Sequence, residues 1–532
     1  MRTVFSVLAG CGLVALGGCI LVYDSGAYDN SVGITGGGGS GGGDEAGGAG
    51  GAGGAGAAGG TDACRIELCH TQETEANCTP VTCPTLTSRR IEAPNEQDTR
   101  ALAVSQVTGD ERIYLAGRFR GSMTVGSSTI TSEGGMGIDD AFVVAFDPQF
   151  VGNWARSVGK ALDPAPAIGY HPRVANGVAF GAGNAVVVGG TYRQNDPLDV
   201  DEDLNAFVRA FDPHLDTVKW SRTFGGAGLD KVVGVAASPQ MAYVLGSLAP
   251  STVGPTDVTI MCGVTSSGII PTNEQNTVLI QFDPMGNCPW ILRFHGGFHR
   301  PTAIAASSTN DIYIAGTYSG KLDGTGKAPP EITEGTAMFV MKVGSNQNVA
   351  WVKTFHNLSG TAMPRAIAVS GSDEVFVTGS LQGDMDFGDG LHQVKQDSPF
   401  VLVLDAGGNA PRTLVLPGAM ATGLGISVTS PGDQAFVTGT FFPTLDIDAS
   451  SPGFEMDEST GMSAFLAKID PQAALLGFDL LGTGEAPIPR WLPLASFGSS
   501  VYLAGGWTKR LRFEGESVMP TDLDLLLARI QP

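Results

Sequence analysis

The sequence predicts an all-β fold, a seven-bladed β-propeller of four-stranded blades that spans residues 86–532. Three observations carry this prediction. The chain has 76 Gly yet is 42% hydrophobic, which indicates short strands joined by many tight turns. A β-branched or aromatic run that ends in Gly recurs seven times. Most units contain four strand-like segments, and the first of these is built from small residues.

The glycine-ended run marks one strand in each unit, which we take as the second. Successive glycines lie 72, 57, 70, 63, 60 and 66 residues apart, so the length varies in loops while the strands recur. The glycines of the seven runs are Gly117, Gly189, Gly246, Gly316, Gly379, Gly439 and Gly505.

A third strand follows in each unit, as in Phe142–Phe146, and an Asp-Pro pair ends it in four units. Asp accepts hydrogen bonds from nearby backbone amides and Pro presets φ, so the pair predicts a turn. A fourth strand then opens near a tryptophan in the first four units, at Trp154, Trp220, Trp290 and Trp351. We interpret these rings and the second-strand tyrosines as packing between blades, because large side chains suit the wide outer strand.

The first strand of each unit is rich in Ala, Gly and Val, as in Ala101–Val104, which suits a crowded inner position. The last unit ends at Pro532 after its third strand. Residues 86–92 stand where a fourth strand would precede the first unit. We therefore expect residues 86–92 to pair with residues 523–530, which closes the ring and removes two exposed sheet edges.

Residues 1–18 read as a lipoprotein signal peptide. Arg2 is followed by an apolar stretch too short to span a bilayer, and Leu16, Gly17 and Gly18 precede Cys19. We expect Cys19 to be lipidated, with palmitate among its acyl chains, and the protein to be anchored in the outer membrane of a Gram-negative bacterium. An ordinary secretory signal is the alternative. Residues 19–63, nearly pure Gly and Ala over much of their length, predict a disordered tether.

Residues 64–85 hold Cys64, Cys69, Cys78 and Cys83. In an exported segment this even count predicts two disulfides, whose pairing the sequence leaves open among three possibilities. Zinc, with His70 beside Cys69, is the alternative. Cys262 and Cys288 flank the third strand of the third unit and predict another disulfide.

The unit that starts at Asp311 and runs Ile-Tyr-Ile-Ala-Gly316, with the Asp-Pro turns and the Trp-opened strands, resembles the bacterial seven-bladed β-propeller repeat of the cell envelope. The Gly/Ala tether behind Cys19 is similar to that of myxobacterial lipoproteins. The resemblance covers about residues 86–532. It implies a fold and a location but no activity, because this family has no shared catalytic residues.

A net charge of −22 argues against nucleic-acid binding, which needs clustered Lys and Arg. The chain has no G-x-S-x-G, H-E-x-x-H or P-loop motif. Quinone-dependent dehydrogenases have eight propeller blades, and many have adjacent cysteines in the site. This chain has seven units and no adjacent cysteines, so we reject that class. We predict a monomeric, non-catalytic protein, not an enzyme, that binds or scaffolds a protein or polysaccharide at the cell envelope. A hydrolase or lyase with a site in the central channel is the alternative.

We expect no cofactor and no metal. Asp384, Asp386 and Asp389 imitate the start of a calcium loop but have no Glu at its twelfth position, so Ca²⁺ there is the alternative to a recurring turn. His295, His299 and His356 are interpreted as loop residues, with a shared metal site as the alternative.

Overall fold

The computed structural model consists of strands and turns, and its described residues contain no helix. It describes residues 67–68, 85–91 and 97–531, except 106, 108–109, 133–138, 159–169, 195–203, 215–216, 226–227, 250–257, 263–264, 271–274, 443, 448–453, 456–461, 485–490, 508–510, 514–515 and 519–523. Over these ranges no helix has the length and hydropathy needed to cross a membrane. The prediction of an all-β fold is confirmed.

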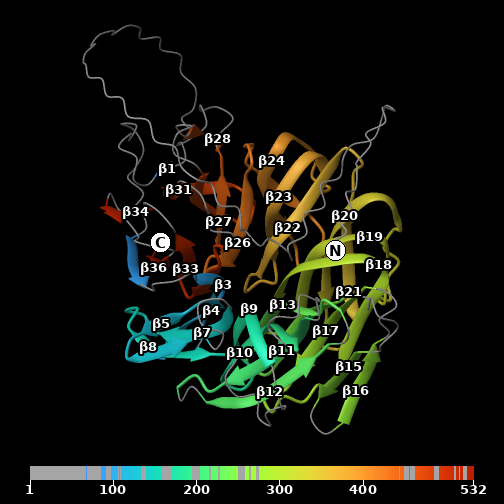
Figure 1. Ribbon diagram of the computed structural model, residues 1–532. Coiled ribbons are helices and arrows are strands. Elements are labelled where there is room, and N and C mark those ends of the chain that lie inside the picture. The colour runs from blue at the N-terminus through green and yellow to red at the C-terminus, as the bar shows by residue number, and fades with distance from the viewer. Residues whose placement is uncertain are drawn as a thin grey trace, which may run out of the picture. The chain divides into compact units, whose positions relative to one another are not determined.

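The strands of the described residues group into four-stranded antiparallel meanders, which we call blades and number in chain order (Figure 1). Blade 1 contains β3 (Gln97–Val104), β4 (Ile113–Phe119), β7 (Asp140–Phe146) and β8 (Gly152–Ser157). Blade 2 contains β9 (Tyr170–Gly181), β10 (Ala185–Gln194), β11 (Leu204–Phe211) and β12 (Val218–Phe224). Blade 3 contains β13 (Lys231–Ala237), β14 (Ala242–Leu248), β17 (Asn276–Phe282) and the start of β18 (Ile291–Ala306).

The long strand β18 continues into blade 4, which joins blades 3 and 4 into one sheet. Blade 4 adds β19 (Ile312–Asp323), β20 (Ile332–Val343) and β21 (Val349–Phe355). Blade 5 contains β22 (Gly360–Val369), β23 (Val375–Asp386), β24 (Leu391–Leu404) and β25 (Arg412–Val415). Blade 6 contains β26 (Thr422–Val428), β27 (Ala435–Phe441), β30 (Met462–Ile469) and β31 (Leu475–Gly484).

The last group, blade 7, contains β32 (Leu494–Phe497), β33 (Ser500–Trp507), β36 (Asp524–Gln531) and, as its fourth strand, β2 (Thr85–Ile91). The pairing expected between the segment at residues 86–92 and the last strand is therefore found. It runs antiparallel, from Thr85 opposite Gln531 to Ile91 opposite Leu525.

Short strands lie between the second and third strands of several blades or at the edge of a sheet. They are β5 (Ser122–Val125), β6 (Ser128–Thr131), β15 (Val258–Cys262), β16 (Thr265–Ile270), β28 (Thr444–Leu445), β29 (Phe454–Glu455), β34 (Leu511–Phe513) and β35 (Glu516–Val518), with β1 (Glu67–Leu68) parallel to β31.

The core lies between neighbouring blades, so the middle strands are buried on both faces. Every residue of β7, β14, β17 and β27 is buried, which explains their continuous apolar runs. One apolar cluster, for example, combines Val187 and Val208 of blade 2 with Val232 and Val244 of blade 3.

The first strands contact one another in succession, from β3 through β9, β13, β18, β22 and β26 to β32, and β32 in turn contacts β3. Several of them, β3, β9, β13, β22 and β26, gather at the centre of the view in Figure 1. Each first strand thus has a neighbour on both sides. Small residues suit this position because the backbones come close together.

The Asp-Pro turns act as the sequence predicts. The Asp147 carboxylate accepts hydrogen bonds from the backbone amides of Gln149 at 3.0 Å and Val151 at 2.7 Å. The Asp405 carboxylate makes the matching bonds in blade 5, although no proline follows it. The carboxylate is therefore the part of the motif that shapes the turn.

The tryptophans join adjacent blades, as predicted. The Trp154 indole Nε1 donates a 2.9 Å hydrogen bond to the carbonyl of Pro213, in the turn of blade 2 that follows its third strand. Trp351 donates in the same way to the carbonyl of Ala406 in blade 5, at 3.1 Å. Trp220 is buried against the equivalent turn of blade 3, but its Nε1 has no hydrogen-bond partner among the described residues.

We expect Trp154→Phe to destabilise the protein by about 1 kcal/mol more than Trp220→Phe, because only the first substitution leaves a carbonyl without its donor. Trp154 and Trp220 are 5% and 6% exposed, so both substitutions should lose the same stability from the smaller buried side chain. Chemical denaturation of both variants measures the difference. Equal losses of stability would show that the Trp154 hydrogen bond contributes nothing.

The recurring glycine of the second strand faces a bulge in the first strand. In blades 1 to 6 the first strand has a bulge residue without a register partner directly after the residue that pairs with this glycine. A Cβ at Gly117 would collide with the carbonyl of Asp98, and one at Gly379 with the carbonyl of Met363. In blade 2 the glycine at this position is Gly190 and not Gly189, the glycine expected from the sequence. The repeat keeps glycine because the bulged backbone occupies the space of a side chain.

Candidate binding face

The bulges place a distinct set of side chains along the first strands. The end of the blades at which first strands begin is called here the connection end. The inner rim is the set of bulge residues of blades 1 to 6 together with the residues two positions before them. The bulge residues are Arg100, Asn176, Val233, Thr302, Arg365 and Leu424, and those before them are Asp98, Val174, Lys231, Arg300, Met363 and Thr422.

The inner rim is basic in an acidic protein. Four of its twelve residues are positively charged and only Asp98 is negative, a net charge of +3 in a chain of net charge −22. The positive residues come from blades 1, 3, 4 and 5. Potential at a protein surface follows the local charge rather than the total, so this rim favours anions.

Arg100 connects the first strand of blade 1 with that of blade 2 and with the segment just before that of blade 7 directly, and with the first strand of blade 3 through Asn176. Its guanidinium bonds to Asp98 at 3.1 Å and to Asn176 of blade 2 at 2.9 Å, and it lies 5.4 Å from the ring centroid of Trp491, just before β32. Asn176 then donates to the carbonyl of Val232 in blade 3 at 2.9 Å. Burial lowers the pKa of Arg100, and the Asp98 carboxylate opposes this effect. Arg100 therefore holds the blades together on this side.

Arg365, on the opposite part of the rim, differs from Arg100. Its side chain is exposed, and no hydrogen bond or ion pair joins it to another described residue. Burial, and then the charge of Arg300, still lower the pKa of Arg365, while Asp397 opposes them. Arg365 is thus partly covered by its surroundings, yet the residue reaches water. Arg365 is therefore a guanidinium open to a ligand.

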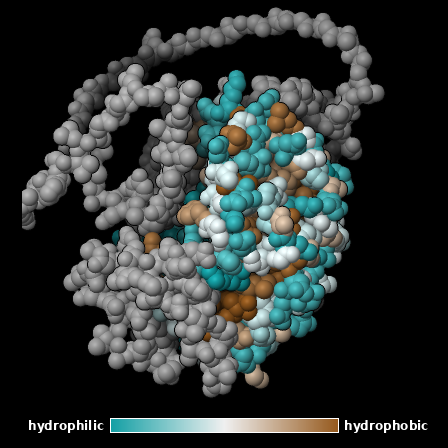
Figure 2. Space-filling view, turned by 90° about the vertical axis from the view of Figure 1, so that its right-hand side faces the viewer, coloured by the Kyte–Doolittle hydropathy of each residue, from teal (hydrophilic) through white to brown (hydrophobic). Residues whose placement is uncertain are grey.

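Seven of the twelve large apolar residues that are exposed in the described part of the chain lie at the connection end. They are Leu229, Phe298, Leu358, Met363, Leu391, Met420 and Trp491, all at least 37% exposed. In the side view of Figure 2, apolar residues lie in small groups among hydrophilic ones. Exposed Met, aromatic and Arg side chains together are typical of protein-binding surfaces.

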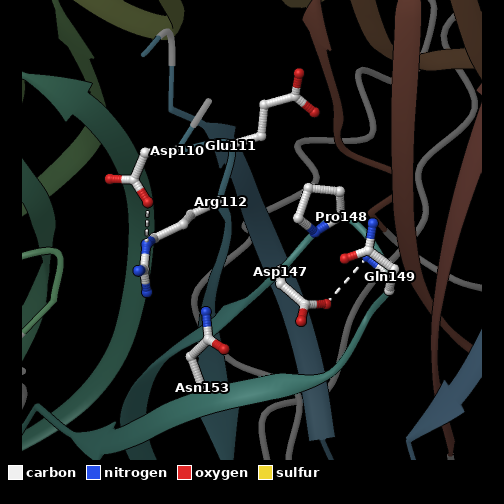
Figure 3. Close-up of a pocket in the computed structure, with 7 residues that line it drawn as sticks. All are labelled: Asp110, Glu111, Arg112, Asp147, Pro148, Gln149 and Asn153. Atoms are coloured by element: carbon white, nitrogen blue, oxygen red, sulfur yellow. Dashed lines mark hydrogen bonds and ion pairs between the residues drawn. The ribbon is translucent and has the colours of Figure 1, made fainter. Parts of the chain in front are cut away.

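The opposite end of the blades carries the turns and is acidic. Its described turns hold eleven acidic residues but only one arginine, Arg112. A pocket of about 390 Å³ lies there in blade 1, lined by Asp110, Glu111, Arg112, Asp147, Pro148, Gln149 and Asn153 (Figure 3).

Three polar groups of this pocket, those of Asp110, Arg112 and Asp147, already have partners. In Figure 3 Arg112 points to Asp110, with 3.0 Å between Nε and Oδ1. His214 of blade 2 lies 3.2 Å from the second oxygen of Asp110, and Asp147 caps its turn. Asp110, Arg112 and Asp147 thus shape the two turns, and the lining contains no large apolar side chain, so the connection end is the better candidate for binding.

The three aspartates considered for calcium lie on one hairpin. Asp386 accepts from the amides of Gly388 and Gly390 and so caps the turn, and Asp389 pairs with His392 at 3.1 Å. Asp384 lies two residues before Asp386 on β23, opposite Gln393. Nowhere in the described ranges do three or more His, Cys, Asp or Glu side chains gather as a metal site.

Two of the three histidines have a ring nitrogen within hydrogen-bond distance of a backbone carbonyl. His299 is fully buried, with its Nε2 2.7 Å from the carbonyl of Lys321, and His356 Nε2 lies 2.9 Å from the carbonyl of Glu334. His295 pairs in register with Asp323. The interpretation of His295 and His299 as loop residues is wrong, because both lie in β18, the strand that continues from blade 3 into blade 4. His356 directly follows β21.

Most of the cysteine predictions fall outside the described residues. Cys19, Cys64, Cys69, Cys78 and Cys83 all lie there. Cys288 is disulfide-bonded. Its expected partner Cys262 ends β15, and because its side chain is not described, this pairing stays a prediction.

Sequence reasoning missed the inner rim because the apolar run of each first strand begins directly after the bulge. Arg100 precedes Ala101 and Arg365 precedes Ala366, so both looked like loop residues before a strand. The one available signal was a repeated polar or basic residue just before the small-residue run. A catalytic channel would need carboxylates and a histidine. Among the twelve rim residues Asp98 is the one carboxylate, and it is ion-paired with Arg100 and Arg118.

The strand pairing defines a β-propeller fold. Solved structures similar to this chain include the phage phi92 endosialidase, with 10% identity and a TM-score of 0.39, covering 84% of this chain and 69% of that one. Synechocystis apocarotenoid oxygenase has 10% identity and a TM-score of 0.34, with coverages of 73% and 72%. A neuraminidase-like protein from A/bat/Guatemala/164/2009 has 9% identity and a TM-score of 0.33, with coverages of 84% and 94%. No family model and no curated protein matches the sequence.

These comparisons correct one prediction. We expected the chain not to be an enzyme, yet an endosialidase and an apocarotenoid oxygenase are among the structures similar to it. Propellers serve both as binding proteins and as enzymes, and catalytic residues in them come from separate blades without forming a sequence motif. The absence of a known motif was therefore not a sufficient ground for that prediction.

Proposed function

We propose that this chain is an exported lipoprotein of the bacterial cell envelope, held by a lipidated Cys19 on a flexible tether. Its seven blades form a ring closed by β2, and the connection end of that ring binds a protein partner. The signal-like residues before Cys19 and the Gly/Ala stretch that follows support the location.

The observation that carries the binding role is the joint placement of apolar side chains and arginines at one end. Phe298, Met420 and Arg365 are exposed there, on rigid strands or the short connections between them. A polysaccharide site needs many hydrogen-bonding groups, whereas Val233 and Leu424 occupy two of the six bulges. Exposed Met, Phe and Leu favour a protein surface as the ligand.

A photo-crosslinking amino acid at Met420 tests this proposal, with the same amino acid at Met285 as the control. Both methionines are strongly exposed, at 61% and 78%, but Met285 lies at the turn end. We expect one defined envelope protein to crosslink from position 420 and not from position 285, because an interface covers only one end. The double variant Leu358→Ser with Phe298→Ser should weaken that crosslink at least fivefold. Identical crosslinks from both positions would contradict the proposal.

A further inference from the structure

The charges of the inner rim specify what part of a partner fits it. Away from the rim the molecule is acidic, with eleven acidic residues in the described turns of the opposite end alone. A long polyanion would meet this negative surface as well as the rim, and would be repelled over most of its length. A short segment that carries one or two carboxylates meets only the rim.

Arg365 supplies the group that binds such a carboxylate. Several other described arginines are already ion-paired, as Arg118 is with Asp139 at 2.8 Å and Arg412 with Glu374 at 2.8 Å. Arg365 has no such partner, since Asp397 acts on it only at longer range. A guanidinium offers two parallel N–H groups that match both oxygens of a carboxylate.

The surroundings of Arg365 add an apolar requirement. Met363 lies two residues earlier on β22 and is 41% exposed, and Leu358 in the connection before β22 is 71% exposed. Met420 precedes β26, the strand next to β22, and is 61% exposed. A ligand that reaches Arg365 therefore also covers apolar side chains.

We propose that Arg365 and its apolar neighbours bind an acidic peptide segment of the partner, one that combines a Glu or Asp carboxylate with Leu-like or aromatic side chains. This inference rests on the proposed function, because it places that segment on the face that binds the partner. Arg100 keeps the rim in place, and Arg365 pairs with the incoming carboxylate.

The test selects peptides from a displayed library of random nonapeptides on the full chain. We expect selected peptides to be enriched in Asp or Glu beside Leu, Met or aromatic residues, and selection on the Arg365→Gln variant to lose the acidic enrichment. A selected peptide should bind Arg365→Gln at least tenfold more weakly than the unchanged protein, because a charged hydrogen-bonded pair is lost. Arg365→Lys should recover part of the affinity, since the charge returns without the paired geometry.

Arg112→Gln is the matched control, because it removes the same charge at the opposite end. It should leave the affinity unchanged. Circular dichroism and the melting temperature should not change in Arg365→Gln, since this side chain bonds to no described residue. The proposal is overturned if acidic peptides are not enriched, if the enrichment persists on Arg365→Gln, or if polygalacturonate competes better than the peptides. If crosslinking from Met420 succeeds in those cases, the proposed function stands and only the acidic segment is rejected.

Discussion

A chain that begins at residue 96 should be about 5 kcal/mol less stable than one that begins at residue 64. The shorter chain lacks β2, the fourth strand of blade 7, whose seven residues pair with β36. Each backbone hydrogen bond contributes about 1 kcal/mol net, and removal of the strand also exposes the edge of β36. Thermal and denaturant unfolding of both chains measures the loss.

The chain that begins at residue 64 is the control, since the compact unit Cys64–Pro532 begins there. It should unfold like the full chain. The loss in the shorter chain should extend to all blades, because β32 of blade 7 contacts β3 of blade 1. Hydrogen exchange that accelerates only in β36 would show that the blades unfold independently. Equal melting temperatures for the two truncated chains would contradict closure by β2.

Gly379→Ala should destabilise the protein by about 3 kcal/mol, because a methyl group there requires the bulged strand β22 to move. The added Cβ would lie inside van der Waals contact with the Met363 carbonyl, which belongs to the backbone and cannot rotate away. The free energy of unfolding, obtained from denaturant titration, measures the change.

Gly477→Ala is the matched control for this substitution. Gly477 also lies within a strand, β31, but the nearest atom to an added Cβ there is the Lys468 Cβ at 3.9 Å, an ordinary contact. We expect a change within about 0.5 kcal/mol. If both substitutions have the same effect, the recurring glycine is not required by the bulge. Because Arg365 lies on the same bulge, Gly379→Ala should also weaken peptide binding.

The seven repeats, their strand order and the turn function of the Asp residues followed from the sequence alone. These features are local: a run such as Ile113–Gly117 carries its strand preference in its own residues, and Asp147 bonds to amides two and four positions away. Repetition made the pattern visible, and the pairing of β2 with β36 followed from counting strands.

Only the tertiary structure decided which residues form the candidate binding face. Arg100 and Arg365 are 265 positions apart, and each looked like a loop residue before an apolar run. The bulges brought them to one rim, since a bulge redirects a side chain according to the backbone of the neighbouring strand and not to its own sequence. That Arg100 is bonded while Arg365 is open depends on contacts with Asp98, Asn176 and Trp491, two of them on other blades. Contacts of this kind arise from the packing of blades and leave no local pattern in the chain.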